Sequence, residues 1–102
     1  MGKASSRRKT PATPWFVYML ECEGGRIYTG VTPDVAARLA KHRTGRGAAF
    51  TRINKPLRLL AHKRCGSRSA ALKTEYSLKQ LPRPEKLVWV ERWARGGRRA
   101  KA

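Results

Sequence analysis

Two runs of apolar residues near the start of the chain predict a β-hairpin. Residues 15–20 are aromatic, β-branched or otherwise apolar, and residues 26–30 form a second run that suits a pleated strand. Gly24 and Gly25 lie between the runs, and glycine tolerates the positive φ angles that a tight turn requires. We therefore expect the fold to begin with two paired strands.

A helix is predicted after the hairpin, from about Asp34 to Arg43. Thr32 suits its N-cap, and Pro33 suits its first position because the amide hydrogen that proline lacks would be unpaired there. Residues 44–55 show no clear period, so we expect them to form a loop.

The second half of the chain predicts one more strand and two more helices. The strand covers about residues 57–64, and Ser67 is the expected N-cap of a helix that ends near Gln80. A last short helix is expected from Pro84, with a strand over residues 87–90 as the alternative. The order β-β-α-β-α-α predicts an α+β fold, in which helices flank a three-stranded antiparallel sheet that starts with the hairpin.

The charge of the chain indicates a polyanionic partner. The 102 residues fit one domain, expected over residues 15–93, between a basic flexible arm (1–14) and a basic flexible tail (94–102). The net charge is +18, and residues 15–90 alone contain 15 basic and 5 acidic residues. Such a field attracts nucleic acid, with binding that weakens as salt rises. A solvated basic surface or an anionic membrane partner is the alternative.

Other sequence features favour a cytoplasmic protein. No apolar run approaches the ~20 residues that a membrane span requires. Residues 1–14 lack the apolar core of a secretory signal. Cys22 and Cys65 are too few and too distant for a zinc site or a disulfide framework, so reduced thiols are expected.

Glu75 is the most informative single residue, because it is the only acid within residues 35–84. Helical spacing places it beside the apolar stripe that contains Ala71 and Leu78. A carboxylate near a core needs a partner, since an unpaired buried charge is costly. That partner is either an arginine such as Arg38 or a divalent cation, held by one carboxylate, water and a substrate phosphate as magnesium often is.

The hairpin resembles the opening of the GIY-YIG endonuclease superfamily. Tyr18 stands at the first tyrosine element, and Tyr28-Thr29-Gly30 stands where the family has Tyr-Ile-Gly. The similarity runs from about Phe16 to Leu81 and is greatest to the small, standalone, single-domain bacterial branch. This chain lacks the later asparagine of many larger members, as that branch does. The later residues that match the family are Arg38, His42 and Glu75.

The resemblance implies a catalytic set, with Glu75 as ligand to one Mg²⁺ or Mn²⁺ ion. Arg38 and His42 lie four residues apart and therefore share one face of the helix. The arginine can bind a phosphate and the histidine can accept or donate a proton. The ordinary alternative is that each is simply a surface residue. A phenol has a pKa near 10, so a tyrosine base needs a neighbour that stabilises phenolate. We favour Tyr28 as the base, because Gly30 beside it allows close approach. The full expected set is Tyr18, Tyr28, Arg38, His42 and Glu75.

These features together predict a metal-dependent endonuclease that hydrolyses DNA with low sequence specificity. Phe50 is expected to plug the core rather than to stack on a base. DNA is favoured over RNA as the partner, and no membrane partner is expected. The alternative is a module on the same fold that binds DNA or RNA without cutting; a weaker one is an RNA- or ribosome-associated protein that works through its tails. The basic residues expected to contact nucleic acid are Lys41, Arg46, Arg52 and Lys55.

Overall fold

A computed structural model describes residues 14–101 of the chain, with side chains described as far as Arg95. Its centre is a three-stranded antiparallel sheet in the order β2-β1-β3, built from β1 (Trp15–Cys22), β2 (Arg26–Thr32) and β3 (Pro56–Cys65). A single helical turn, η1 (Glu23–Gly25), joins β1 to β2, and Gly24 and Gly25 have φ angles of 80° and 75°. The predicted hairpin and the α+β class are therefore confirmed.

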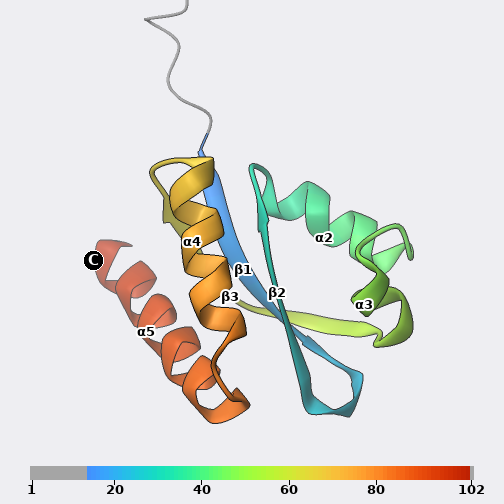
Figure 1. The fold of residues 1–102 in the computed structure, drawn as a ribbon. Coiled ribbons are helices and arrows are strands. Elements are labelled where there is room, and N and C mark those ends of the chain that lie inside the picture. Colours follow the sequence, from blue (N-terminus) through green and yellow to red (C-terminus); the bar gives the residue numbers. More distant parts are fainter. Residues whose placement is uncertain (1–13, 102) are drawn as a thin grey trace, which may run out of the picture.

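Four helices surround the sheet: α2 (Val35–Arg43), α3 (Ala49–Ile53), α4 (Arg68–Lys79) and α5 (Arg83–Lys101). In Figure 1 the sheet lies between two helical layers, with α2 and α3 on one side and α4 and α5 on the other. Among residues 14–101, no helix combines the length and apolarity that a bilayer crossing needs.

The central strand β1 is covered on both faces. Val17 and Met19 point to one face and Tyr18 and Leu20 to the other, because side chains alternate along a strand, and each is at most 1% exposed. Ala71 and Leu78 of α4 complete the first core, together with partly buried side chains of α5. Leu39 of α2 packs against the second core, which contains Tyr18.

Strand β3 contains an irregularity that explains why its apolar positions alternate imperfectly. Ala61 pairs with Met19, whereas Leu59 pairs with Leu20, so Leu60 is an extra residue in the ladder. The bulge shifts the alternation of side chains by one position, so that Leu60 packs against the core that contains Met19 and Leu59 packs against the core that contains Leu20.

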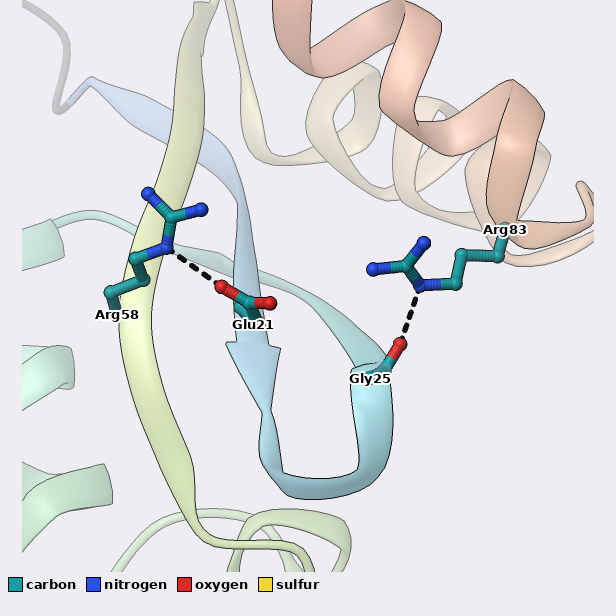
Figure 2. A network of polar contacts seen from close by, with 4 residues as sticks. All are labelled: Glu21, Gly25, Arg58 and Arg83. Atoms are coloured by element: carbon teal, nitrogen blue, oxygen red, sulfur yellow. Dashed lines mark hydrogen bonds and ion pairs between the residues drawn. The ribbon is translucent and has the colours of Figure 1, made fainter.

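Polar contacts at the far end of the hairpin connect it to β3 and α5 (Figure 2). Arg58 of β3 donates to the Glu21 carboxylate at 2.7 Å. The Arg83 side chain, from the first residue of α5, donates from Nε to the carbonyl oxygen of Gly25. The glycine turn is thus held next to the start of the last helix.

The structure corrects three details of the predicted elements. The first helix is capped by Asp34, whose side chain accepts from the Ala37 amide at 3.1 Å, while Thr32 Oγ1 accepts from the Asp34 amide. Residues 44–55 are not a plain loop, because α3 forms within them. The third difference is the length of the last helix, α5.

The last helix is longer than expected and continues to Lys101, past the predicted tail boundary at Trp93. Gly96 and Gly97 lower helix propensity by about 1 kcal/mol each relative to alanine, but the surrounding alanine, arginine and lysine residues favour continuation. Residues 1–13 of the predicted flexible arm lie outside the described residues.

Replacing Ser67 by alanine is predicted to destabilise the protein by about 1 kcal/mol. Ser67 caps α4 as the sequence predicted, since its side chain accepts from the Ala70 amide at 3.1 Å. Chemical denaturation measures the free energy of unfolding. Ser69→Ala, at an exposed position in the first turn of α4, is the control and should change it by less than about 0.5 kcal/mol. Equal effects of the two substitutions would contradict the capping role.

Candidate active site

A buried hydrogen bond joins the hairpin to the first helix. The hydroxyl of Tyr18, on β1, lies 2.9 Å from Nε2 of His42, on the last turn of α2. Tyr18 is 1% exposed and His42 is 2% exposed. Two residues 24 positions apart are therefore paired away from solvent.

Thr51 of α3 completes this contact on the far side of the imidazole. Its Oγ1 lies 2.7 Å from Nδ1 of His42 and donates to the carbonyl oxygen of Ala48 at 2.9 Å. Thr51 is itself 3% exposed. The sequence did not single out Thr51, because the segment around it shows no period that predicts α3.

Two glycines make room for the paired side chains. A Cβ atom at Gly30 would lie 2.6 Å from the Tyr18 hydroxyl and 2.9 Å from the Tyr28 ring. A Cβ atom at Gly47 would lie 2.1 Å from Nδ1 of His42. Both distances are too short for any larger residue without rearrangement. The sequence indicated close approach at Gly30, but it gave no such indication at Gly47, which lies in the segment expected to be a loop.

Tyr28 lies at the centre of an aromatic cluster. Its ring centroid is 6.1 Å from that of Tyr18, 5.3 Å from that of His42 and 5.7 Å from that of Phe50. Tyr28 is half-buried, so it forms the outer side of the site, whereas Tyr18 lies inside. Phe50 is 37% exposed and covers Tyr28 from outside, so the expectation that it plugs the core is wrong.

Arg38 lies beside the tyrosines from one turn earlier on α2. A hydrogen-bonding contact with the Tyr18 hydroxyl raises the pKa of the Arg38 guanidinium, while partial burial opposes that change. Its Nε is buried and has no hydrogen-bond partner among the described residues. A buried guanidinium nitrogen without a partner is uncommon in folded proteins, and it marks Arg38 as a candidate functional residue.

Glu75 approaches the site from α4. Its carboxylate is 18% exposed and pairs with Lys79 at 3.3 Å. The ion pair that the sequence offered for Glu75, with Arg38, is therefore not the one that forms. Lys79 Nζ also lies 5.9 Å from the ring centroid of Tyr28, so it connects the carboxylate to the tyrosines.

Burial controls the protonation of the two hydrogen-bonded residues. Desolvation raises the pKa of Tyr18 to about 12, although Arg38 acts in the opposite direction. Desolvation also lowers the pKa of His42 below its ordinary value of 6.5, and the charge of Arg38 adds to this effect. At neutral pH the tyrosine therefore keeps its proton and the imidazole remains neutral.

Basic side chains line two hollows beside the site. One, of about 650 Å³, is lined by His42 and Thr51 together with Arg52 and Lys55. The other, of about 450 Å³, is lined by residues that include Arg38, Lys41 and Arg68. Three of the four residues expected to contact nucleic acid thus share a hollow with His42 or Arg38, while Arg46 is exposed in the turn after α2.

The geometry of the site agrees with what comparison to known protein families finds. A hairpin with facing tyrosines, a helix that carries arginine and histidine, and a later helix that carries glutamate define a class of nuclease domain. The GIY-YIG catalytic domain family matches residues 14–88, and the chain belongs to this family. Members of the family are nucleases that act on nucleic acid and generally use divalent metal ions.

Within that family, the chain is similar to small proteins of the UPF0213 group. One from Cupriavidus pinatubonensis is 48% identical over 75 residues, which are 74% of this chain and 83% of the relative. One from Xanthomonas campestris is 42% identical over 78 residues, which are 76% of each chain. The solution NMR structure of UPF0213 protein BH0048 from Bacillus halodurans is 42% identical, covers 76% of this chain and 83% of its own, and has a TM-score of 0.49.

The described residues fit a metal ion that is held sparsely. No group of three or more His, Cys, Asp or Glu side chains in the described part of the chain gathers as a ligand cage. A single partly buried carboxylate, Glu75, matches the way Mg²⁺ binds through one or two carboxylates, water and substrate phosphate.

The free energy of unfolding is predicted to fall as pH decreases below about 6.5. Because the pKa of His42 is lower in the folded protein, the unfolded chain binds a proton first on acidification. The free energy of unfolding therefore falls as the pH decreases from the ordinary histidine pKa to the lower pKa of His42 in the folded protein. Denaturation at about pH 7.5 and about pH 5.5 measures this. His42→Gln should reduce the difference between the two pH values.

The matched control for that measurement is the other histidine. His62 lies on β3 with an exposed side chain, so His62→Gln should leave the pH difference as it is in the natural protein. An identical pH difference in all three proteins would show that the His42 imidazole does not resist protonation.

Proposed function

We propose that this protein is a metal-dependent DNA endonuclease of low sequence specificity. The observation that carries the proposal is the buried hydrogen bond from Tyr18 to His42, next to the unpartnered Nε of Arg38. A tyrosine in contact with a neutral imidazole can pass on a proton, and an adjacent guanidinium can hold the phosphate from which the reaction starts.

The proposed reaction is hydrolysis of a backbone phosphodiester. The water oxygen forms a bond to phosphorus while the bond to the leaving oxygen breaks. One water proton moves to the Tyr18 oxygen as the Tyr18 proton moves to Nε2 of His42. The leaving oxygen takes a proton from solvent, and His42 later returns its proton to solvent. Arg38 stabilises the charge on the phosphate, and Tyr28 orients the water.

Tyr18 replaces Tyr28 as the base that we favour. Tyr18 is the tyrosine that is hydrogen-bonded to a proton acceptor, whereas Tyr28 contacts His42 through its ring. The raised pKa of Tyr18, about 12, means that phenolate is rare at neutral pH. Transfer from water and transfer to His42 therefore have to occur together, because a pre-formed phenolate would cost too much free energy.

A divalent ion held by Glu75, Mg²⁺ or Mn²⁺, would polarise the phosphate and stabilise the leaving oxygen when bound. Lys41 lines the hollow that contains Arg38, and Arg52 and Lys55 line the hollow that contains His42. We propose that these three residues hold the nucleic acid backbone on either side of the cut. Arg46 would add a contact beyond them. Contacts of this kind position the backbone and carry little sequence information.

A cytoplasmic location is consistent with the free thiols of Cys22 and Cys65. The alternative function is a module that binds nucleic acid without cutting it. One specific observation favours it, since Glu75 already pairs with Lys79 and a metal would have to displace that contact.

Glu75→Gln is predicted to lower DNA cleavage by more than about 100-fold with Mg²⁺ or Mn²⁺. Binding of uncleaved DNA should be unchanged or tighter, because a negative charge is removed beside a phosphate site. Cleavage of duplex, nicked and single-stranded DNA, with binding measured in parallel by fluorescence anisotropy, separates the enzyme from the binding module.

Glu91→Gln is the matched control, because Glu91 forms an equivalent pair with Arg95 four residues later, at 3.2 Å and on α5. It should leave both cleavage and binding intact. No cleavage of any substrate by the natural protein would eliminate the endonuclease.

Tyr18→Phe is predicted to lower the cleavage rate by about 10² to 10⁴ while leaving DNA binding intact, because it removes the proton that passes to His42. Single-turnover cleavage measures the chemical step. Tyr76→Phe, at a position 69% exposed, is the control and should have no effect. A larger loss from Tyr28→Phe than from Tyr18→Phe would return the role of base to Tyr28.

A further inference from the structure

We propose that Thr51 is a positioning residue, which fixes His42 as the tautomer that carries its hydrogen on Nδ1. The relevance of this to catalysis rests on the proposed endonuclease function, but the tautomer itself does not. The observation behind it is the continuous series of hydrogen bonds from Tyr18 through His42 and Thr51 to Ala48.

The direction of each hydrogen bond follows from the end of the series. The Thr51 hydroxyl has one hydrogen and donates it to the carbonyl oxygen of Ala48 at 2.9 Å, an oxygen that also accepts from the backbone amides of Thr51 and Arg52. The Thr51 oxygen must then accept at its other contact, the 2.7 Å one with His42. Nδ1 of His42 is therefore the nitrogen that carries hydrogen, and Nε2 has a free lone pair.

The opposite end of the series favours the same tautomer but does not determine it alone. Among the described residues, the side-chain hydrogen-bond partner of the Tyr18 hydroxyl is His42. The Tyr18 hydrogen needs an acceptor, and Nε2 of His42 lies 2.9 Å away. The other tautomer would place a hydrogen on Nε2 and leave the Tyr18 hydrogen without this acceptor.

Burial makes the choice of tautomer strict. Tyr18, His42 and Thr51 are all at most 3% exposed, so water does not replace a lost partner easily. Gly47 adds to the constraint, because only a missing side chain lets the chain pass so close to Nδ1. Helix α3 thus places one hydroxyl where it determines which imidazole nitrogen accepts a proton.

The consequence for the proposed reaction is geometric. When Nε2 takes the Tyr18 hydrogen, His42 becomes an imidazolium with hydrogen on both nitrogens, and Thr51 already accepts from Nδ1. Only the hydrogen bond between Tyr18 and His42 exchanges donor and acceptor during the transfer, whereas those from His42 to Thr51 and from Thr51 to Ala48 keep their direction. A preorganised acceptor of this kind removes the cost of reorientation from the chemical step.

The experiment is a long-range ¹H–¹⁵N NMR correlation on protein with ¹⁵N-labelled histidine, at a pH where the imidazole is neutral. It distinguishes protonated from unprotonated ring nitrogens directly. We expect hydrogen on Nδ1 of His42 in the natural protein and in Thr51→Ser. In Thr51→Val, which keeps the shape but loses the hydroxyl, we expect a mixture or the opposite tautomer.

The matched control is Thr44→Val, which also removes a hydroxyl that donates to a backbone carbonyl, that of Lys41 at 3.1 Å. It should leave the His42 tautomer and the cleavage rate unchanged. Thr51→Val should lower single-turnover cleavage about tenfold or more, with DNA binding intact, and Thr51→Ser should restore most of the rate.

Hydrogen on Nε2 of His42 in the natural protein would overturn the inference, and this measurement needs no variant to fold. An unchanged tautomer in folded Thr51→Val would overturn it as well. If the tautomer depends on Thr51 as expected but the natural protein cuts no nucleic acid, the positioning role stands and the endonuclease function fails.

Discussion

A phenol hydroxyl buried within the fold must have a hydrogen-bond partner, and much of this site follows from that requirement. Tyr18 lies on the central strand and is covered by α2, so its partner has to come from the covering layer. His42 meets the need, but its own second nitrogen then needs a partner as well. The hydroxyl oxygen of Thr51 supplies that partner. The Thr51 hydroxyl in turn donates to the backbone carbonyl of Ala48, which ends the series.

The two faces of the sheet contribute different parts of the site. Helices α2 and α3 provide the imidazole of His42 and the hydroxyl of Thr51, while α4, in the layer on the other side of the sheet, provides the carboxylate of Glu75 (Figure 1). They meet at β2, an edge strand, where Tyr28 touches His42 and Lys79 reaches the same ring. An edge strand is the place where side chains from both layers can approach one substrate.

The features that the sequence predicted are those that depend on local chemistry. The glycine turn of the hairpin and the Ser67 cap of α4 are decided by residues within one or two turns of each other. Gly47 and Thr51 belong to the other kind, because each matters only through its contact with His42, made across a tertiary interface. The bulge at Leu60 also depends on tertiary contacts, because the core against which Leu60 packs exists only once the helices have packed on the sheet. The family motif supplied Arg38, His42 and Glu75 in advance, but not the partners that orient them.

The contact between Glu75 and Lys79 is compatible with a metal site in energetic terms. Lys79 is 50% exposed, and a helix pair of this spacing and exposure contributes only about 0.3–0.5 kcal/mol. Coordination of a divalent cation by a carboxylate and a phosphate involves far larger electrostatic free energies than this ion pair does. The cation can therefore displace Lys79 from Glu75 readily. Lys79 would then be released beside Tyr28, where a phosphate would be its natural new partner. The lysine would then hold the carboxylate in place before the ion binds and bind the substrate afterwards, so that the observed pair is compatible with catalysis as well as with the binding module.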